Sequence, residues 1–252
     1  MPSRDKDSYC IQSVENALDV LEALCDEDED VRISRLSEKL QMNKTSVFRL
    51  LATFESRGYV ERKDDSGKYR LGLSAYEIGQ KLLSRMGLLR QAHPVMERFV
   101  RDCDETLYLA VQRDREVLFL DMVDTSQQVK IVSLVGKRFP LQRTAPGQLL
   151  LALTPDSVST TGDETLPPAK AELIRKNGYV LETGGLGEGI CCLATPLFES
   201  GGKLNGSLCL VGPDFRLTKE RIETDLLPKL KETSAIISSK LGFHNPYLSR
   251  QI

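Results

Sequence analysis

Residues 33–72 read ISRLSEKLQMNKTSVFRLLATFESRGYVERKDDSGKYRLG. The stretch predicts a short helix, a tight connection and a longer helix that starts at Lys44. Gly58–Lys63 and Lys68–Gly72 predict two short strands around a turn at Asp64–Gly67. A helix, a turn, a second helix and a β-hairpin, in this order, indicate a winged helix-turn-helix, in which the hairpin is the wing.

The longer helix has one apolar side and one polar side. Its apolar residues recur at i, i+3, i+4 and i+7, and they are Val47, Leu50, Leu51 and Phe54. Asn43 stands where a side-chain oxygen can cap this helix, Ser34 is expected to cap the shorter one, and Gly58 ends the longer one. The polar side near the helix start is expected to face the major groove of DNA. It carries Lys44, Thr45, Ser46 and Arg49.

The same region concentrates positive charge. Between Arg32 and Arg70 there are ten basic and five acidic residues, a local net charge of +5 on a chain whose formal net charge is −2. Phosphate binding needs such a local basic surface and not a basic protein overall. The wing cations expected to hold the DNA backbone are Arg62, Lys63, Lys68 and Arg70. Residues 26–30, all acidic, are expected to form a solvated loop that faces away from DNA.

An ordinary helical hairpin with a solvated charged face would carry similar charges. It would not require the cap, the apolar stripe, the exposed Lys, Thr, Ser and Arg side chains and the basic wing in this order. The combination therefore favours DNA binding.

Two further helices flank this region. A first helix, with an apolar stripe that would complete the DNA-binding core, is predicted from Val14, Ala17, Leu18, Leu21 and Leu24. A helix over Ser74–Leu83 is expected to carry the chain away from the wing, with apolar residues free to contact another chain. These are Ile78, Leu82 and Leu83. Gly87 is expected to loosen the passage into a second domain, and Pro94 to stand in the first turn of a new helix.

Beyond Glu105 the pattern changes to strands. Leu107–Val111 and Val117–Leu120 predict a hairpin, and Val129–Ser133 alternates like a further strand. Later strands are expected over Cys191–Pro196 and Leu204–Val211, and helices over Ala169–Lys176 and from Thr218 to Leu241 with a break or restart at Pro228. This mixture predicts an α+β domain in which helices pack on an antiparallel sheet.

Several motifs resemble the IclR family of bacterial transcription regulators. They are Ser13–Leu21 before the helix-turn-helix, Gly58-Tyr59-Val60, Thr106–Ala110, Thr144–Ala152, Gly178-Tyr179 and Gly189–Pro196. The resemblance implies a winged helix-turn-helix over residues 13–72 after a flexible tail at 1–12. It further implies a linker helix at 73–87 and a GAF/profilin-like effector-binding domain at 88–252.

The resemblance also implies a site for a small organic acid in the second domain. The matching positions are Thr144, Ala145, Glu182, Cys192, Cys209 and Val211. Cys209 and Val211 stand where members that bind small 2-oxo acids often have hydroxyls, which favours a more apolar ligand such as an aromatic or longer-chain acid. A structural role is equally open for each residue: the cysteines as small buried apolar groups, and Glu182 as a loop cap.

Catalysis is disfavoured by the residue types present. Acyl transfer or hydrolysis usually needs a base beside a nucleophile, and the chain has only two histidines, His93 and His244. No Gly-x-Ser-x-Gly elbow or phosphate-binding Gly-x-x-x-x-Gly-Lys occurs, and the six cysteines show no zinc or disulfide spacing. No cofactor and no metal site is predicted, and a reducing cytoplasm is expected. The lack of a long apolar run or an apolar leader predicts no membrane partner.

The expected partners are double-stranded operator DNA, a small-molecule effector and a second copy of the chain. One recognition helix covers few base pairs, so paired half-sites and a homodimer are expected. The family resemblance implies tetramers as pairs of dimers. Two other classes stay open: a redox- or metal-responsive regulator that uses the cysteines, and an enzyme or interaction module that retains a DNA-binding fold by ancestry.

Overall fold

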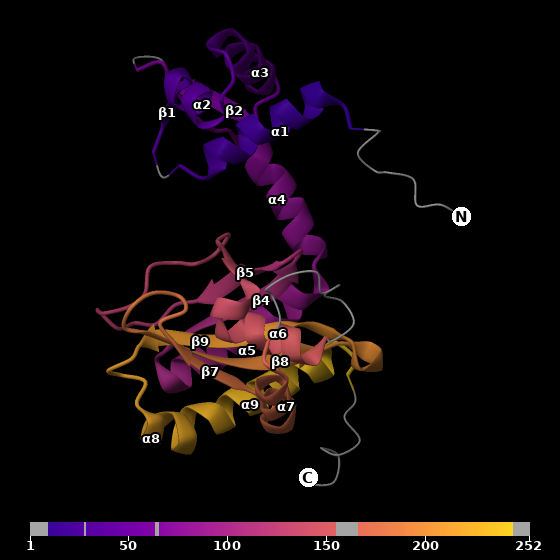
Figure 1. The fold of residues 1–252 in the computed structure, drawn as a ribbon, viewed down its shortest axis with the longest axis vertical. Helices are drawn as coiled ribbons and strands as arrows, with labels where there is room; N and C mark the ends of the chain where they lie inside the picture. Colours follow the sequence, from indigo (N-terminus) through magenta and orange to yellow (C-terminus); the bar gives the residue numbers. More distant parts are fainter. Residues whose placement is uncertain (1–9, 28, 64–65, 155–165, 244–252) are drawn as a thin grey trace. The chain divides into compact units, whose positions relative to one another are not determined.

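The computed structural model describes residues 10–27, 29–63, 66–154 and 166–243, and the chain divides into two compact units between Arg85 and Met86 (Figure 1). The expected tail lies mostly outside the described residues, as do the Asp64-Asp65 pair of the wing turn and His244. No helix in the described part is long and apolar enough to cross a membrane.

The first unit is a winged helix-turn-helix followed by one more helix. In chain order it has α1 (Gln12–Cys25), β1 (Val31–Arg32), α2 (Ile33–Lys39), α3 (Lys44–Ser56), β2 (Val60–Lys63), β3 (Lys68–Leu71) and α4 (Leu73–Arg85). The strands form an antiparallel sheet in the order β1-β3-β2. Val47 and Leu51 of α3 are fully buried against α1, α2 and the sheet, as the apolar stripe predicts.

The helix ends follow the sequence signals in part. The Asn43 side chain accepts a hydrogen bond from Ser46 N at 2.8 Å, which confirms it as the cap of α3. Gly58 follows α3 with φ of 74°, the left-handed conformation that ends many helices. Ser34 does not cap α2, because that helix already begins at Ile33 after Arg32.

Helix α1 buries only the C-terminal part of the predicted stripe, where Leu24 is in the core and Leu21 packs against it. Val20, Ala23 and Leu24 are its buried residues, whereas Val14 and Leu18 are each about half exposed. Only the C-terminal half of α1 therefore packs on the unit's own core.

The second unit is built on a six-stranded antiparallel sheet in the order β6-β5-β4-β9-β8-β7. The bounds of its elements are α5 (Gly87–Cys103), β4 (Thr106–Arg113), β5 (Glu116–Val123), β6 (Arg138–Pro140), the 3₁₀ turn η2 (Leu141–Arg143), α6 (Ala145–Leu153), α7 (Pro168–Asn177), β7 (Val180–Thr183), β8 (Ile190–Phe198), η3 (Ser200–Gly202), β9 (Leu204–Pro213), α8 (Lys219–Arg221), the π-helical turn η4 (Ile222–Leu226) and α9 (Leu227–Lys240). The α+β class is confirmed.

Two apolar layers lie on opposite faces of this sheet, because successive side chains of a strand alternate between the faces. On one face, Leu107 and Leu109 of β4 pack with residues of α5 and α9. On the other face, Tyr108 and Ala110 of the same strand pack with residues of α6 and α7. The second layer, called the α6 core below, contains most of the predicted effector positions.

Two expectations for this unit are wrong. Val129–Ser133 is not a strand: its backbone has no strand partner, and the edge of the sheet is taken by β6 instead. Pro94 lies inside α5, where eight apolar side chains of that helix are buried and packing outweighs the cost of proline, about 3 kcal/mol in a helix interior. Gly87 is the first residue of α5, and α4 ends at Arg85.

Candidate functional site

The start of α3 presents polar side chains to solvent, as the sequence predicts. Lys44, Thr45 and Arg49 are exposed, and Ser46 is half-buried. The backbone amide of Ser46 is used by the Asn43 cap, which fixes the first turn of the helix and the direction of its side chains. Phe48, which no sequence pattern singled out, lies on the same helix and is 48% exposed.

The strand register divides the four wing cations between two faces. Arg62 lies opposite Tyr69, which is buried in the core, so Arg62 projects from the core-facing side of the sheet near the wing turn. Lys63 lies opposite Lys68 on the other face, and Arg70 lies opposite Glu61 on that face too. The sequence predicted four equivalent wing cations. The structure instead places Arg62 on one face of the sheet and Lys63, Lys68 and Arg70 on the other.

Two of these cations are engaged within the unit. Lys63 Nζ lies 3.1 Å from Asp30 Oδ2, and Arg70 Nη2 lies 2.9 Å from Glu61 Oε2. Both cations are more than half exposed, and pairs of this kind typically contribute about 0–1 kcal/mol, so phosphate can compete for them. Within the described residues, Arg62 and Lys68 form no ion pair.

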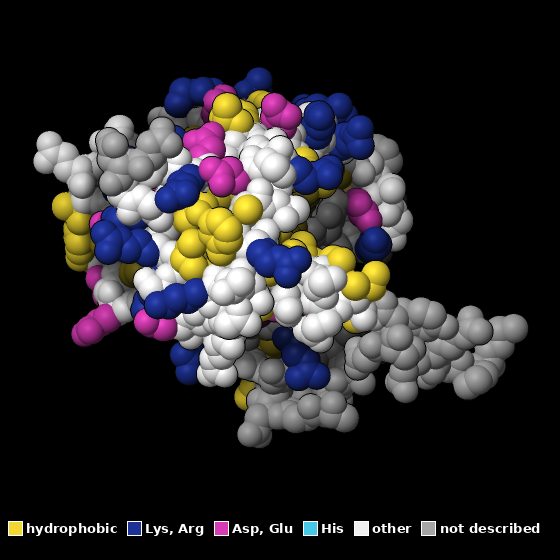
Figure 2. Space-filling view, turned by 90° about the horizontal axis from the view of Figure 1, so that it is seen from above, with side chains coloured by type: hydrophobic (Ala, Val, Ile, Leu, Met, Phe, Trp, Pro, Cys, Tyr) yellow, Lys and Arg dark blue, Asp and Glu magenta, His cyan; other side chains and the backbone are white. Residues whose placement is uncertain are grey.

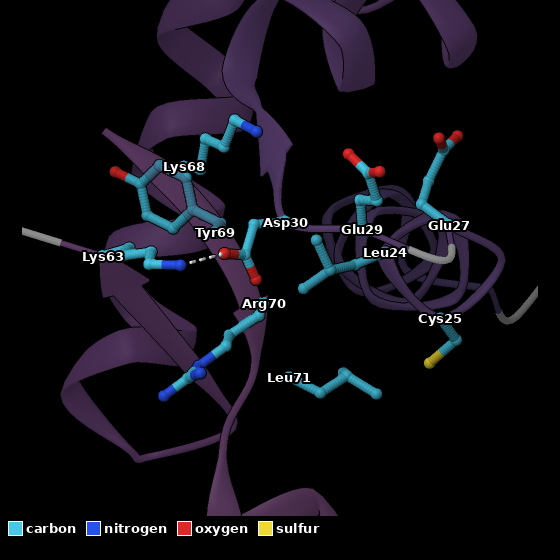
Figure 3. A pocket seen from close by; sticks show the side chains of 10 residues that line it. All are labelled: Leu24, Cys25, Glu27, Glu29, Asp30, Lys63, Lys68, Tyr69, Arg70 and Leu71. Atoms are coloured by element: carbon cyan, nitrogen blue, oxygen red, sulfur yellow. Dashed lines mark hydrogen bonds and ion pairs between the residues drawn. The ribbon is translucent and has the colours of Figure 1, made fainter. Parts of the chain in front are cut away.

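The acidic loop contacts basic residues of its own unit. Lys39 Nζ lies 3.2 Å from Asp26 Oδ2 and 3.3 Å from Glu27 Oε1. Figure 3 shows Glu27 and Glu29 on one side of a cleft and the wing residues Lys63, Lys68 and Arg70 on the other, with Asp30 between them and in contact with Lys63. The cleft has a volume of about 610 Å³. The loop is therefore not simply solvated, because its carboxylates pair with Lys39 and Lys63.

In the second unit, the structure brings the predicted effector positions together. Ala145, Cys192, Cys209 and Val211 are buried in the α6 core. Thr144 precedes Ala145, is fully buried, and caps α6 by accepting a hydrogen bond from Gly147 N at 3.2 Å. The β8 and β9 strands place Cys192 opposite Val211.

Glu182 lies at the edge of the same sheet face, because β7 pairs it with Cys192. Both of its carboxylate oxygens accept from Gly185 N at 2.9 Å, so the side chain caps the loop after β7. Gly185 packs so closely on Arg143 that a β-carbon would overlap the Arg143 carbonyl oxygen, which requires glycine there. The loop thereby holds Glu182 beside the residue that precedes Thr144.

Two buried polar atoms in the described part of the chain have no hydrogen-bond partner. They are the Tyr108 hydroxyl and the side-chain oxygen of Gln148. Tyr108 lies opposite Cys209 in the α6 core and packs edge-on to Phe119 at 5.4 Å between ring centroids. Burial raises the pKa of Tyr108, and the backbone of Leu134 nearby offsets part of this rise. The Leu134 backbone and the Tyr108 hydroxyl do not form a hydrogen bond of ordinary geometry.

Leaving a buried polar atom unpaired costs about 1–3 kcal/mol, so such atoms mark positions where a ligand can supply the partner. Tyr108 is part of the family motif Thr106–Ala110, which gave it no predicted role. A tyrosine within the apolar run Leu107–Val111 was the available signal.

The cysteines of the α6 core are not arranged for thiol reactivity. A hydrogen bond with Cys209, together with complete burial, holds the pKa of Cys192 well above its ordinary value. Burial likewise raises the pKa of Cys191, which lies in the apolar layer on the other face of the sheet. Thiols react as thiolates, so raised pKa values slow oxidation. Within the described residues, no three His, Cys, Asp or Glu side chains gather as metal ligands.

A further cleft of about 380 Å³ lies elsewhere on the second unit. It is lined by Val111, Gln112, Asp114, Leu150, Thr154, Leu204 and Asn205. None of the six predicted effector residues lines this cleft.

A winged helix-turn-helix with a polar, cationic helix face, followed by an α+β unit with unpaired polar atoms in its core, defines a DNA-binding regulator with a ligand-binding domain. Residues 13–64 match the IclR helix-turn-helix domain, and residues 80–239 match the bacterial transcriptional regulator IclR C-terminal domain. The chain belongs to the IclR family of bacterial transcriptional regulators.

Relatives match over nearly the whole length. The HTH-type transcriptional regulator KdgR of Escherichia coli (strain K12) is 29% identical over 96% of this chain and 97% of its own. The crystal structure of the Thermotoga maritima IclR is 26% identical, covers 92% of this chain and 99% of its own, and has a TM-score of 0.71. An IclR homolog from Microbacterium hydrocarbonoxydans, complexed with 4-hydroxybenzoate, shares the fold with a TM-score of 0.75, at 24% identity over 91% of this chain and 99% of its own.

Proposed function

We propose that the protein binds operator DNA as a homodimer through α3 and the wing, and that a small organic acid in the α6 core changes its operator affinity. Thr45, Ser46 and Arg49 contact base edges or nearby phosphates, and Lys44 holds the backbone beside them. The observation that carries the DNA-binding part is the exposed polar start of α3, fixed in direction by the Asn43 cap.

Arg49→Ala is expected to weaken operator binding about 10- to 100-fold and to relax the base preference at one position of each half-site. A guanidinium held to a guanine by two hydrogen bonds contributes about 1–3 kcal/mol of discrimination. The measurement is fluorescence anisotropy with an operator selected from random duplex DNA by the full-length protein. Unchanged affinity and base preference would show that this face of α3 does not read the bases.

The wing supplies the matched controls, since its cations hold phosphates and carry no base information. Substitutions at Arg62, Lys63, Lys68 or Arg70 are expected to lower affinity evenly across sequences and to flatten its dependence on salt. Arg62→Ala is expected to cost more than Arg70→Ala, because Arg70 already pairs with Glu61.

The effector site is proposed for the α6 core. Its walls are mostly apolar and are proposed to consist of Thr144, Ala145, Cys192, Cys209 and Val211. Glu182 lies beside them on the edge strand β7. Tyr108 adds a buried hydroxyl without a partner in the same core, and a few polar groups in an apolar cavity suit a small ligand. The start of α6 favours an anion, although the Thr144 hydroxyl and Pro146 leave fewer free amides there. The relative complexed with 4-hydroxybenzoate supports an aromatic acid as the ligand class.

Tyr108→Phe is expected to weaken binding of such an acid about fivefold and to leave the melting temperature unchanged or slightly higher. The first effect follows from losing one hydrogen bond of about 1 kcal/mol, and the second from removing a buried hydroxyl that has no partner. Calorimetric titration with 4-hydroxybenzoate, pyruvate and octanoate measures the affinity.

Tyr179→Phe is the control, because Tyr179 packs against the other face of the sheet. If Tyr108→Phe and Tyr179→Phe bind each acid as the parent does, the Tyr108 hydroxyl is not part of the effector site. A fall in melting temperature on Tyr108→Phe would point to a structural partner for that hydroxyl instead.

The homodimer is proposed to form through α1 and α4. No residue of α4 is buried within the chain, and Ile78 and Leu82 are 53% and 60% exposed. Val14 and Leu18 on the N-terminal half of α1 are exposed as well. We propose α4 as the linker between the DNA-binding and effector-binding domains, and tetramers as pairs of dimers. A ligand can then bias α4 by about 1–3 kcal/mol, the usual coupling between two sites.

A further inference from the structure

Phe48 is an exposed apolar residue beside the polar residues of α3 that are proposed to contact DNA. It lies three residues after Thr45 and one before Arg49, and nearly half of its surface is exposed. Residues three and four apart are neighbours on a helix, so Phe48 stands beside Thr45 and Lys44 on that exposed surface. The core cluster of the unit includes Val47 and Leu51 of α3 but not Phe48.

The surroundings of Phe48 point to DNA as its partner. Apolar contact that removes an exposed phenyl ring from water lowers the free energy. Its helix neighbours Lys44 and Arg49 are exposed cations, which match phosphate and repel a second basic surface. Figure 2 shows exposed hydrophobic side chains near Lys and Arg side chains, and also near Asp and Glu side chains, on the face seen from above.

In the major groove, one base presents an apolar group. Thymine carries a 5-methyl group, whereas the other three bases present only hydrogen-bond donors and acceptors there. Phenylalanine is one of the side chains that contact this methyl group.

We propose that Phe48 reads a thymine methyl group in each half-site of the operator. The inference rests on the proposed function, since it requires α3 to enter the major groove. The thymine lies close to the base that Arg49 contacts, because the two residues are consecutive in α3. Phe48 then sets specificity by apolar contact, whereas Arg49 sets it by hydrogen bonds.

The test removes one methyl group at a time from the DNA. In the operator selected by the full-length protein, each thymine is replaced in turn by deoxyuridine, which pairs identically and lacks only the methyl group. The parent is expected to lose about three- to tenfold in affinity at one thymine per half-site. Phe48→Ala is expected to bind the unmodified operator more weakly by a similar factor and to show no further loss at that deoxyuridine.

The control positions are the remaining thymines, where deoxyuridine should not change binding by either protein. The proposal is overturned if no thymine is sensitive in the parent, or if Phe48→Ala keeps the sensitivity of the parent. It is also overturned if Phe48→Ala sediments as a monomer where the parent is a dimer, which would make Phe48 an interface residue.

Failure of the proposed function gives a different result. If α3 does not read DNA, selection with Arg49→Ala enriches the same sequence as the parent and binds it equally well. The proposed function stands and Phe48 alone is reassigned if Arg49→Ala loses base preference while no deoxyuridine position responds.

Discussion

A variant with Ile78→Glu and Leu82→Glu on α4 is expected to sediment as a monomer and to lose operator affinity about 10²- to 10⁴-fold. In a dimer, binding of the first half-site brings the second recognition helix to its half-site at high effective concentration, and a monomer loses that gain. Both side chains are more than half exposed within the chain, so the substitutions should leave the fold of each protomer intact.

The size of this effect follows from the apolar area. Burying one Ile or Leu side chain contributes about 1.5–3 kcal/mol, and a symmetric interface counts each residue twice. Placing carboxylates at these positions removes that gain and sets like charges against one another across the two-fold axis.

The matched control is Gln80→Glu with Ser84→Glu on the same helix, which changes the net charge by the same two units. Both residues are polar and exposed, and they lie away from Ile78 and Leu82 around the helix. This control should remain a dimer by analytical ultracentrifugation at micromolar concentration. If the Ile78/Leu82 variant also remains a dimer and binds operator normally, α4 is not the dimer contact.

Local signals in the sequence were sufficient for much of the first unit. Asn43 caps α3 because its side chain reaches an amide three residues away, and Gly58 ends α3 because glycine accepts a positive φ. The apolar stripe of α3 needs only the helical period. These features depend on neighbours within a few residues, so the residues alone could identify them.

Features that depend on residues distant in the sequence were not predicted from the sequence. Pro94 looked like a helix start, yet the packing of α5 on the sheet keeps it inside the helix. Val129–Ser133 alternates like a strand, but no strand lies beside it. The division of the wing cations required the register of β2 and β3, and the unpaired Tyr108 hydroxyl became apparent only when its surroundings were complete.

The largest stability effect is expected at a residue that the sequence did not single out. Glu105 is fully buried, and Arg216 binds both of its carboxylate oxygens, with Nε at 2.7 Å and Nη2 at 2.8 Å. Arg221 Nη1 donates to the same carboxylate at 2.6 Å. The partners lie 111 and 116 residues away in the sequence, so no local pattern could reveal them.

The cluster of Glu105, Arg216 and Arg221 connects three segments of the second unit by hydrogen bonds. Besides Glu105, Arg216 donates to the backbone oxygen of Val129 at 2.8 Å, and Arg221 donates to that of Cys103 at 3.0 Å. It therefore joins the end of α5 to residues 216–221, which include α8, and to the loop after β5. Leu134 of that loop is buried in the α6 core, so the cluster also holds one wall of the proposed effector site.

Glu105→Ala is expected to destabilise the second unit by about 3–5 kcal/mol, because removing one partner leaves buried charges unpaired. Glu97→Ala, which breaks an exposed pair with Arg101, should cost at most about 1 kcal/mol. Calorimetric melting of the full chain compares the two, and the loss should fall on the transition of the second unit, since Glu105 belongs to it. Below that transition, Glu105→Ala should weaken ligand binding through the loop that carries Leu134, while ligand-free operator binding by α3 stays near the parental value. If Glu105→Ala and Glu97→Ala melt alike, the arginines are satisfied by solvent and the cluster does not hold the core together.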